Sequence, residues 1–474
     1  MGLELEDIQG LITTGHSHLN YSIFLLLRVV EKQAAKGWLK SLITQITTAR
    51  HRSKAEGKPR RALHVLFSIG GLQALGLPAE SLGTFPIEFQ EGLAEARRSR
   101  VLGDTGDSDP LKWTWGGSRD SEAHLVLMLY AQDDAELLAL CREQRDAIQR
   151  DGGLREIASE EAVVPPDRKE PFGFRDGIAQ PAVEGISYKS STDDNSDDEP
   201  IKAGEFVLGY LNEYGILPNS PTVPSELNSA HLLPPVRDDS AEADFGKNGS
   251  YLVLRKLSQD VPGFYAYLKQ QALNLYGTAT EAQITRLGAK CVGRWPSGAP
   301  LVLAPAADDP KLGADPRRSD RFKFAETDPQ GFACPLGAHI RRANPRDTIT
   351  SNTKESMQVA RRHRVIRRGR PYKTSSSDGT SGAEQGILFI AINASLNRQF
   401  EFIQQTWMNN LKFGGLYNDN DAIVGDNDGT CTFTMPGHPV REQLKDLPRF
   451  VQVRAGGYFF MPGIRALRFL AALP

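Results

Sequence analysis

Apolar residues along the chain gather in two pairs of runs, and each run is followed by a segment with helical spacing. Ser22 to Arg28 and Ser250 to Arg255 are short apolar stretches rich in strand-forming residues. His124 to Tyr130 and Gly386 to Ile392 form the second pair. After each run, apolar residues recur every three or four positions, which is the period of an α-helix. We therefore expect two strand–helix units in each half of the chain.

The recurrence of these units predicts the fold class. The first pair of runs aligns on Arg28 and Arg255 with a one-residue gap, and the second pair aligns without a gap. A repeat of this kind is typical of a duplicated α+β architecture built on a mostly antiparallel sheet. We divide the chain into an N-terminal domain, residues 1–200, and a C-terminal domain, residues 201–474, with the surplus length in long loops.

The segments near this boundary differ in their polar pattern. Ser190 to Pro200 is acidic and contains no apolar residue, so we expect an exposed linker. Gly204 to Leu211 alternates between apolar and polar residues, which predicts a strand. Pro218 to Asp244 is rich in proline and serine and is expected to be irregular.

Composition and charge exclude several classes of protein. Of 474 residues, 40% are hydrophobic and 24% charged, which is typical of a globular chain. The net charge of −2 creates no general attraction for nucleic acid or a membrane surface. We find no spanning segment, no secretory signal pattern and no CxxC pair among the four cysteines. These features predict a cytoplasmic protein, because widely spaced cysteines fit a reducing compartment.

Two short motifs could carry chemistry. Gly173-Phe-Arg-Asp-Gly177 places Asp176 in a tight turn between glycines, and on its own a structural turn is the better interpretation. Cys334-Pro-Leu-Gly-Ala-His339 places a histidine after small residues, which leave room for a large planar group. A lone histidine is nevertheless more often structural than a metal ligand.

The third motif is an arginine-rich stretch, residues 361–370, together with Arg341, Arg342 and Arg346. Such a cluster could be a solvated basic face, or it could neutralise the carboxylates or phosphates of an anionic ligand. A nucleic-acid site is disfavoured by the net charge and by the scarcity of interleaved aromatic residues.

In this order, the three motifs resemble those of the dye-decolorizing peroxidase family of heme enzymes, in its larger subclass. Asp7 to Gly10, Ile366-Arg367 before Pro371-Tyr372, Gly386 to Ile390 and Gly456 to Pro462 extend the resemblance over nearly the whole chain. The resemblance implies two ferredoxin-like domains. The first would carry the Asp176 motif, and the second would hold most of the heme.

The resemblance also implies a set of site residues. His339 would bind the iron of heme b, Asp421 would accept a hydrogen bond from that histidine, and Asp176 and Arg367 would be catalytic. The remaining cofactor-binding residues would be Arg341, Ile387 and Phe389. Two of these assignments stay open. Asp419 and Asp426 lie near Asp421 in the sequence and could take its role, and Arg364 and Arg368 could likewise take the role of Arg367.

The chemistry of these residue types fits peroxide activation. Hydrogen peroxide must lose a proton to bind iron, and its outer oxygen must gain one to leave as water, so Asp176 would act first as a base and then as an acid. Arg367 would stabilise negative charge on the splitting O–O bond. We expect an acidic pH optimum, because an unperturbed aspartic acid titrates at about pH 3.9.

The implied function is a peroxidase that uses hydrogen peroxide to oxidise bulky organic electron donors through an oxoferryl intermediate. Bulky donors such as anthraquinone dyes and phenols would react at the heme edge or through an aromatic relay. The relay candidates are Trp113, Trp115, Trp295, Trp407 and Tyr372. The alternative is a non-enzymatic heme-binding or heme-delivery protein, and the oligomeric state is left open.

Overall fold

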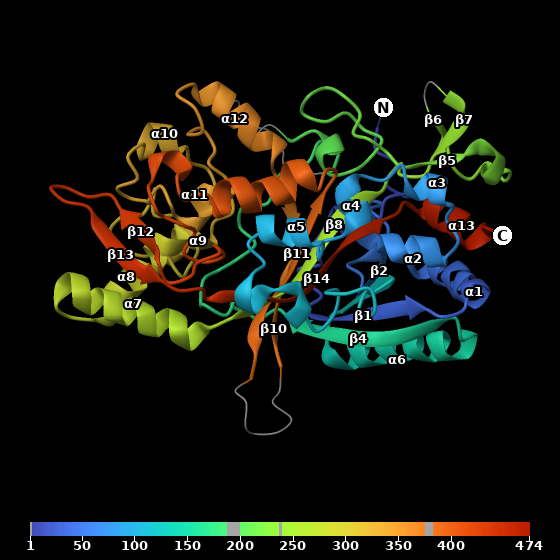
Figure 1. Ribbon diagram of the computed structural model, residues 1–474, viewed down its shortest axis with the longest axis horizontal. Helices are drawn as coiled ribbons and strands as arrows, with labels where there is room; N and C mark the ends of the chain where they lie inside the picture. Colours follow the sequence, from blue (N-terminus) through green and yellow to red (C-terminus); the bar gives the residue numbers. More distant parts are fainter. Residues whose placement is uncertain (1, 187–199, 237–238, 375–382) are drawn as a thin grey trace.

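The computed structural model describes residues 2–186, 200–236, 239–374 and 383–474, and its centre is one large antiparallel sheet (Figure 1). Most of the predicted linker at 190–200 lies outside the described residues. Nine strands form this sheet in the described part of the chain. They are β1 (Tyr21–Val29), β2 (Arg61–Phe67), β3 (Leu125–Ala131), β4 (Leu154–Val163), β8 (Ser250–Gln259), β9 (Ile366–Arg367), β10 (Arg370–Lys373), β11 (Gln385–Asn393) and β14 (Val451–Met461).

The strand order confirms the predicted duplication. Along the sheet the order is β10-β11-β8-β14-β2-β3-β1-β4, with β9 paired to β11. In the N-terminal half, β1 lies between β3 and β4, and β2 lies beyond β3. In the C-terminal half, β8 lies between β11 and β14, and β10 lies beyond β11. This is the ferredoxin-like order. The halves join where β14 pairs with β2 at Phe460 and Phe67. The fold class is therefore α+β with two ferredoxin-like halves, as predicted, while the boundary at residue 200 stays a prediction.

The central strands are largely apolar because most of their residues are buried on both faces of the sheet. On β1, Leu25 and Leu27 pack into a cluster with the covering helices, and Phe24 and Leu26 face a second cluster between the two halves. The edge strands β10 and β4 contact each other, so the sheet curls around this second cluster. Burial on both faces replaces the alternating pattern of a half-exposed strand with a continuous hydrophobic run.

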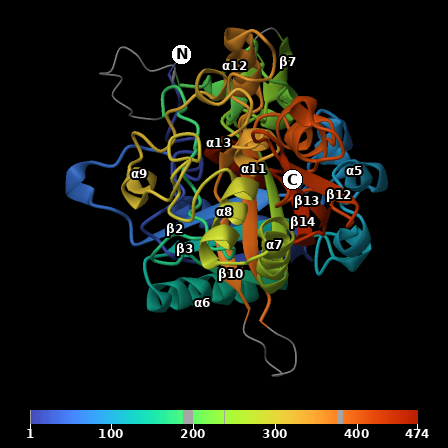
Figure 2. The same cartoon turned by 90° about the vertical axis from the view of Figure 1, so that its left-hand side faces the viewer.

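Helices cover both ends of the molecule. The larger ones are α1 (Lys32–Leu42), α6 (Asp134–Asp151), α7 (Val261–Tyr276), α8 (Glu281–Val292), α12 (Thr353–Arg362) and α13 (Ile464–Ala472), and a π-helical segment runs through Asn397–Glu401 and Ile403–Met408. The short ones are α2 (Ile69–Ala74), α3 (Ala79–Leu82), α4 (Ile87–Glu91), α5 (Ala96–Val101), α9 (Pro310–Ala314), α10 (Phe324–Thr327) and α11 (His339–Ala343). Helices α1, α6 and α13 lie at one end, and α7, α8 and α11 lie at the other, which faces the viewer in Figure 2. Among the described residues, no helix has the length and apolar character needed to span a membrane.

Two expectations about the insertions were wrong. Gly204 to Leu211 is a short turn and loop rather than a strand, and its consecutive residues Phe206, Val207 and Leu208 are all buried. The region from 218 to 244 is not wholly irregular, because β5 (Thr222–Pro224), β6 (Pro235–Val236) and β7 (Asp239–Asp244) form a small sheet. A further hairpin, β12 (Cys431–Met435) with β13 (Glu442–Leu447), packs near α7.

Candidate active site

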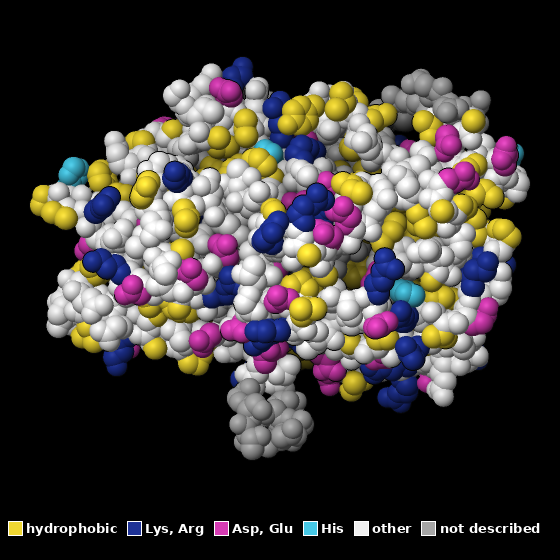
Figure 3. Space-filling view, viewed as in Figure 1, with side chains coloured by type: hydrophobic (Ala, Val, Ile, Leu, Met, Phe, Trp, Pro, Cys, Tyr) yellow, Lys and Arg dark blue, Asp and Glu magenta, His cyan; other side chains and the backbone are white. Residues whose placement is uncertain are grey.

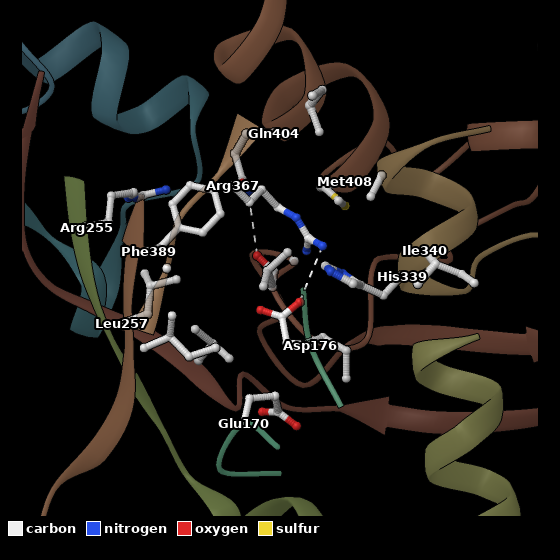
Figure 4. A pocket seen from close by; sticks show the side chains of 18 of the residues that line it. Glu170, Asp176, Arg255, Leu257, His339, Ile340, Arg367, Phe389, Gln404 and Met408 are labelled. Carbon is white, nitrogen blue, oxygen red and sulfur yellow. Dashed lines mark hydrogen bonds and ion pairs between the residues drawn. The ribbon is translucent and has the colours of Figure 1, made fainter. Parts of the chain in front are cut away.

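A cavity of about 280 Å³ lies where the C-terminal half of the sheet meets α11 and the loop that follows β4. Apolar residues from β8, β11 and the π-helical segment form much of its wall. Three of the predicted residues, Asp176, His339 and Arg367, line it together (Figure 4). The first and last of them, Asp176 and Arg367, are separated by more than 150 residues in the sequence, so only the fold brings the three to the same cavity.

His339 opens α11 and is held by a buried carboxylate. Its Nδ1 lies 3.0 Å from Oδ2 of Asp421, which is fully buried. Oδ1 of the same carboxylate accepts the backbone N–H groups of Ile423 and Val424 at 2.9 and 2.8 Å. Burial alone would raise the pKa of Asp421, but His339 and the backbone donors outweigh it and lower that pKa. The ionised carboxylate therefore keeps the proton of His339 on Nδ1, and Nε2 is the nitrogen left to face the cavity.

Arg342 sets the geometry of this pair, and the sequence interpretation did not assign it a role. Its guanidinium is completely buried. It donates hydrogen bonds to the carbonyl oxygens of Gly337, Trp407, Met408, Asn410 and Asp419. These bonds join α11, which carries His339, to the chain segment that leads into Asp421.

Asp176 and Arg367 face each other across the cavity from His339. Nη2 of Arg367 lies 3.3 Å from Oδ1 of Asp176. The backbone N–H of Arg367 donates to Oε1 of Gln180 at 3.0 Å. The loop that carries Asp176 is therefore hydrogen-bonded to strand β9, which carries Arg367. Gln180 belongs to the same sequence motif as Asp176. Its closeness to Asp176 in the sequence is the feature from which its role at the site could have been predicted.

The two neighbouring arginines take different places. Arg364 also lines the cavity and donates to the carbonyl of Ala179 at 3.0 Å. Arg368 points away, because its guanidinium donates to the carbonyls of Leu11 and Ile12. Of the three candidates, Arg367 is the one that forms an ion pair with Asp176.

Strand β11 contributes the apolar wall above this ion pair. Ile387 and Phe389 both line the cavity, whereas Leu388 and Ile390 between and after them belong to the buried cluster on the other face. This division follows from the two-residue period of a strand. The structure therefore places both predicted residues at the cavity.

Arg341 is not at the cavity, contrary to its predicted role in cofactor binding. Its guanidinium is buried and donates to the carbonyls of Asp328 and Cys334, both at 3.0 Å, and it lies over the ring of Phe324. Successive residues of an α-helix are rotated by about 100°, so Arg341 points about 200° away from His339. Besides Arg367, the arginines that do line the cavity are Arg175, Arg255, Arg294, Arg364 and Arg449.

The arginine-rich stretch is an internal framework rather than a solvated face. Arg342 and Arg370 are almost completely buried, and Arg370 donates to the carbonyls of Leu19, Gly15 and His16. On the face shown in Figure 3, basic and acidic side chains are interspersed. The relay candidates Trp113, Trp115, Trp295, Trp407 and Tyr372 are all buried.

Comparison with known proteins identifies the family. A dye-decolorizing peroxidase of Mycetinis scorodonius is 30% identical over 98% of this chain and 87% of its own length. The chain belongs to the dye-decolorizing peroxidase family. A second member, from Auricularia auricula-judae, is also 30% identical and covers 98% of this chain and 86% of its own. No family model matches the chain.

Solved structures agree with this membership. A fungal dye-decolorizing-type peroxidase from Auricularia auricula-judae superimposes with a TM-score of 0.79 and 27% identity over the whole of both chains. A dye-decolorizing peroxidase in complex with 2,6-dimethoxyphenol gives a TM-score of 0.78 at 26% identity, over 99% of this chain and all of that one. The chain is therefore a peroxidase, as predicted, and the comparisons do not support the heme-delivery alternative.

Proposed function

We propose that the cavity holds heme b, with its iron bound to Nε2 of His339, and that the enzyme uses hydrogen peroxide to oxidise bulky organic donors. One observation carries this proposal. A histidine backed by a buried carboxylate faces an aspartate–arginine pair across a single cavity. The first pair suits an axial iron ligand, and the second suits acid–base work on a small substrate.

The residues at the cavity fit a heme. Its walls are largely apolar, as the faces of a porphyrin require, with Ile387, Phe389 and Met408 among them. Arg175 and Arg364, which line the cavity, would supply positive charge for the two propionates, in place of Arg341, which was expected to bind the cofactor. When bound, the heme supplies a redox-active iron with one open coordination position.

Asp421 would tune the iron ligand. A carboxylate that accepts the Nδ1–H of a ligating histidine fixes the ring orientation and makes Nε2 a stronger electron donor. Oδ1 of Asp421 is already held by two backbone N–H groups, so the carboxylate cannot rotate away from His339.

Asp176 and Arg367 would act on peroxide. The carboxylate of Asp176 would accept a proton from one oxygen of hydrogen peroxide and return it to the other. The guanidinium of Arg367, 3.3 Å from that carboxylate, would stabilise negative charge on peroxide. Ile387 and Phe389 would limit the space beside the ion pair.

The electron donors would react outside this pocket. One related solved structure is a complex with 2,6-dimethoxyphenol, and the family is named for its action on dyes. We infer that phenols and anthraquinone-type dyes are too large for the space between Asp176 and the iron, and that they donate electrons at the heme edge. We also propose that the chain divides into domains at residue 200, the first supplying Asp176 and the second supplying His339 and Arg367.

The purified protein loaded with heme tests the proposal. Mixing it with hydrogen peroxide and an anthraquinone dye should bleach the dye, and Asp176→Asn should slow the peroxide-dependent step. If heme binds but D176N and R367L react with peroxide at the wild-type rate, the pocket binds heme without using these residues for catalysis.

A further inference from the structure

A second carboxylate in the cavity, Glu170, holds the loop that carries Asp176 (Figure 4). Oε1 of Glu170 accepts the backbone N–H of Phe174 at 2.9 Å, and Oε2 accepts that of Phe172, also at 2.9 Å. Oε2 accepts a third hydrogen bond from Nε2 of Gln259 at 2.7 Å. Both oxygens of the carboxylate are therefore occupied by donors from the loop and from the end of strand β8.

The backbone closes around the same residue. The N–H of Glu170 donates to the carbonyl of Phe174 at 2.9 Å, and the N–H of Gly173 donates to the carbonyl of Glu170 at 2.8 Å. Gly173 adopts a φ of 88°, which the tight turn requires and which residues with a side chain rarely adopt. Asp176 follows this turn directly, and its own N–H donates to the carbonyl of Arg168 at 3.2 Å.

Gln259 shows that the hydrogen bond to Glu170 dominates the local arrangement. Its Oε1 is buried and has no hydrogen-bond partner among the described residues. Leaving a buried carbonyl oxygen unpaired is unfavourable. Rotating the amide would instead place this oxygen against the Glu170 carboxylate, so the observed orientation is the one that serves Glu170.

The same three donors also bear on the charge of Glu170. Burial and the nearby Asp176 raise the pKa of Glu170. The Gln259 amide and the two loop N–H groups offset only part of that rise. A neutral amide at position 170 could not reproduce this arrangement, because its –NH₂ group would meet a second donor.

We propose that Glu170 is a positioning residue that holds the 170–176 loop so that the Asp176 carboxylate stays opposite Arg367. This inference rests on the proposed role of Asp176 in peroxide activation. Glu170 acts through Asp176 and not on the peroxide, since its oxygens are already taken by Phe172, Phe174 and Gln259.

The test is a double-mutant cycle in the heme-loaded protein, read as the rate of the spectral change after mixing with peroxide between pH 3 and pH 8. E170Q should lower that rate about 10- to 100-fold, because a misplacement of about 1 Å costs that much at a reacting centre. D176N/E170Q should react no more slowly than D176N alone. Hydrogen exchange at the amides of Phe172 and Phe174 should be faster in E170Q, whether or not the enzyme turns over.

Glu31 offers a matched control. It is exposed, lies outside the cavity, and accepts the backbone N–H groups of Gln33 and Ala34 at 2.9 and 2.5 Å. E31Q should leave the peroxide rate unchanged over the whole pH range. If E170Q does not fold, Gln259→Leu removes the third hydrogen bond and should lower the rate in the same direction by a smaller factor.

Three results would overturn the inference. They are a wild-type rate in E170Q, a further tenfold loss when E170Q is added to D176N, and unchanged amide exchange at Phe172 and Phe174. If D176N itself reacts at the wild-type rate, the proposed function of Asp176 fails, and the amide exchange still reports whether Glu170 holds the loop.

Discussion

The hydrogen bond between His339 and Asp421 makes a quantitative prediction. In Asp421→Asn the side chain keeps its shape, but the charge that faces Nδ1 of His339 at 3.0 Å is lost. Because Oδ1 is held by the N–H groups of Ile423 and Val424, the amide must turn its –NH₂ group toward His339. That group cannot accept the Nδ1 proton. A hydrogen bond to a charged group contributes about 1.5–3 kcal/mol.

Since about 1.4 kcal/mol corresponds to a factor of ten, D421N should weaken heme binding about 10- to 100-fold. The assay is the rate at which heme leaves the protein for a high-affinity acceptor protein, followed at the Soret band. Asp419 supplies the control, because it is equally buried but accepts from Thr434 N–H and the Thr432 hydroxyl. D419N should change heme loss less than threefold, and an equal effect of the two variants would refute the reasoning.

Three further predictions follow from the same structure. D176N should slow the reaction with peroxide about 10²- to 10⁴-fold in stopped-flow measurements while the heme content stays at the wild-type level, and a loss of less than tenfold would contradict its acid–base role. Arg341→Gln should lower the free energy of unfolding by about 3–5 kcal/mol in urea titrations, because it removes the positive charge that pairs with the buried Asp328 carboxylate. An unchanged urea midpoint would contradict this structural role of Arg341. Burial lowers the pKa of His64 to about 3 and that of His16 well below its usual value, so the unfolded chain binds more protons than the folded one from about pH 6.5 downward. Stability should therefore fall with decreasing pH over that range, by about 1.4 kcal/mol per pH unit for each histidine, and H64L should show a shallower slope in thermal unfolding.

The fold was predictable because its strands are buried on both faces. Phe24 and Leu25 point to opposite sides of β1, and both are completely buried, so the strand is recognisable as an unbroken apolar run. The stretch from 204 to 211 was expected to be a strand because it alternates, yet it forms a loop in which Phe206 to Leu208 are buried without a strand partner among the described residues. Burial and alternation alone cannot distinguish these cases, because strand pairing depends on distant segments of the chain.

The candidate site was predictable to the level of the motif but not always to the level of the side chain. The motif around His339 identified the correct segment, but helical rotation directs Arg341 away from the cavity. The choice among Arg364, Arg367 and Arg368 needed the ion pair with Asp176. Glu170 and Arg342 carried no recognisable signal, because their roles consist of hydrogen bonds to backbone groups that only the folded chain brings near.

The most direct test of the account is the absorption spectrum of wild-type protein and His339→Ala, each mixed with one equivalent of heme and then with one equivalent of peroxide. The account predicts a Soret band in the wild type that changes on adding peroxide, and a lost or greatly weakened band in H339A. A variant lacking His339 that shows the same band and the same change would contradict the assignment of the iron ligand and, with it, the proposed site.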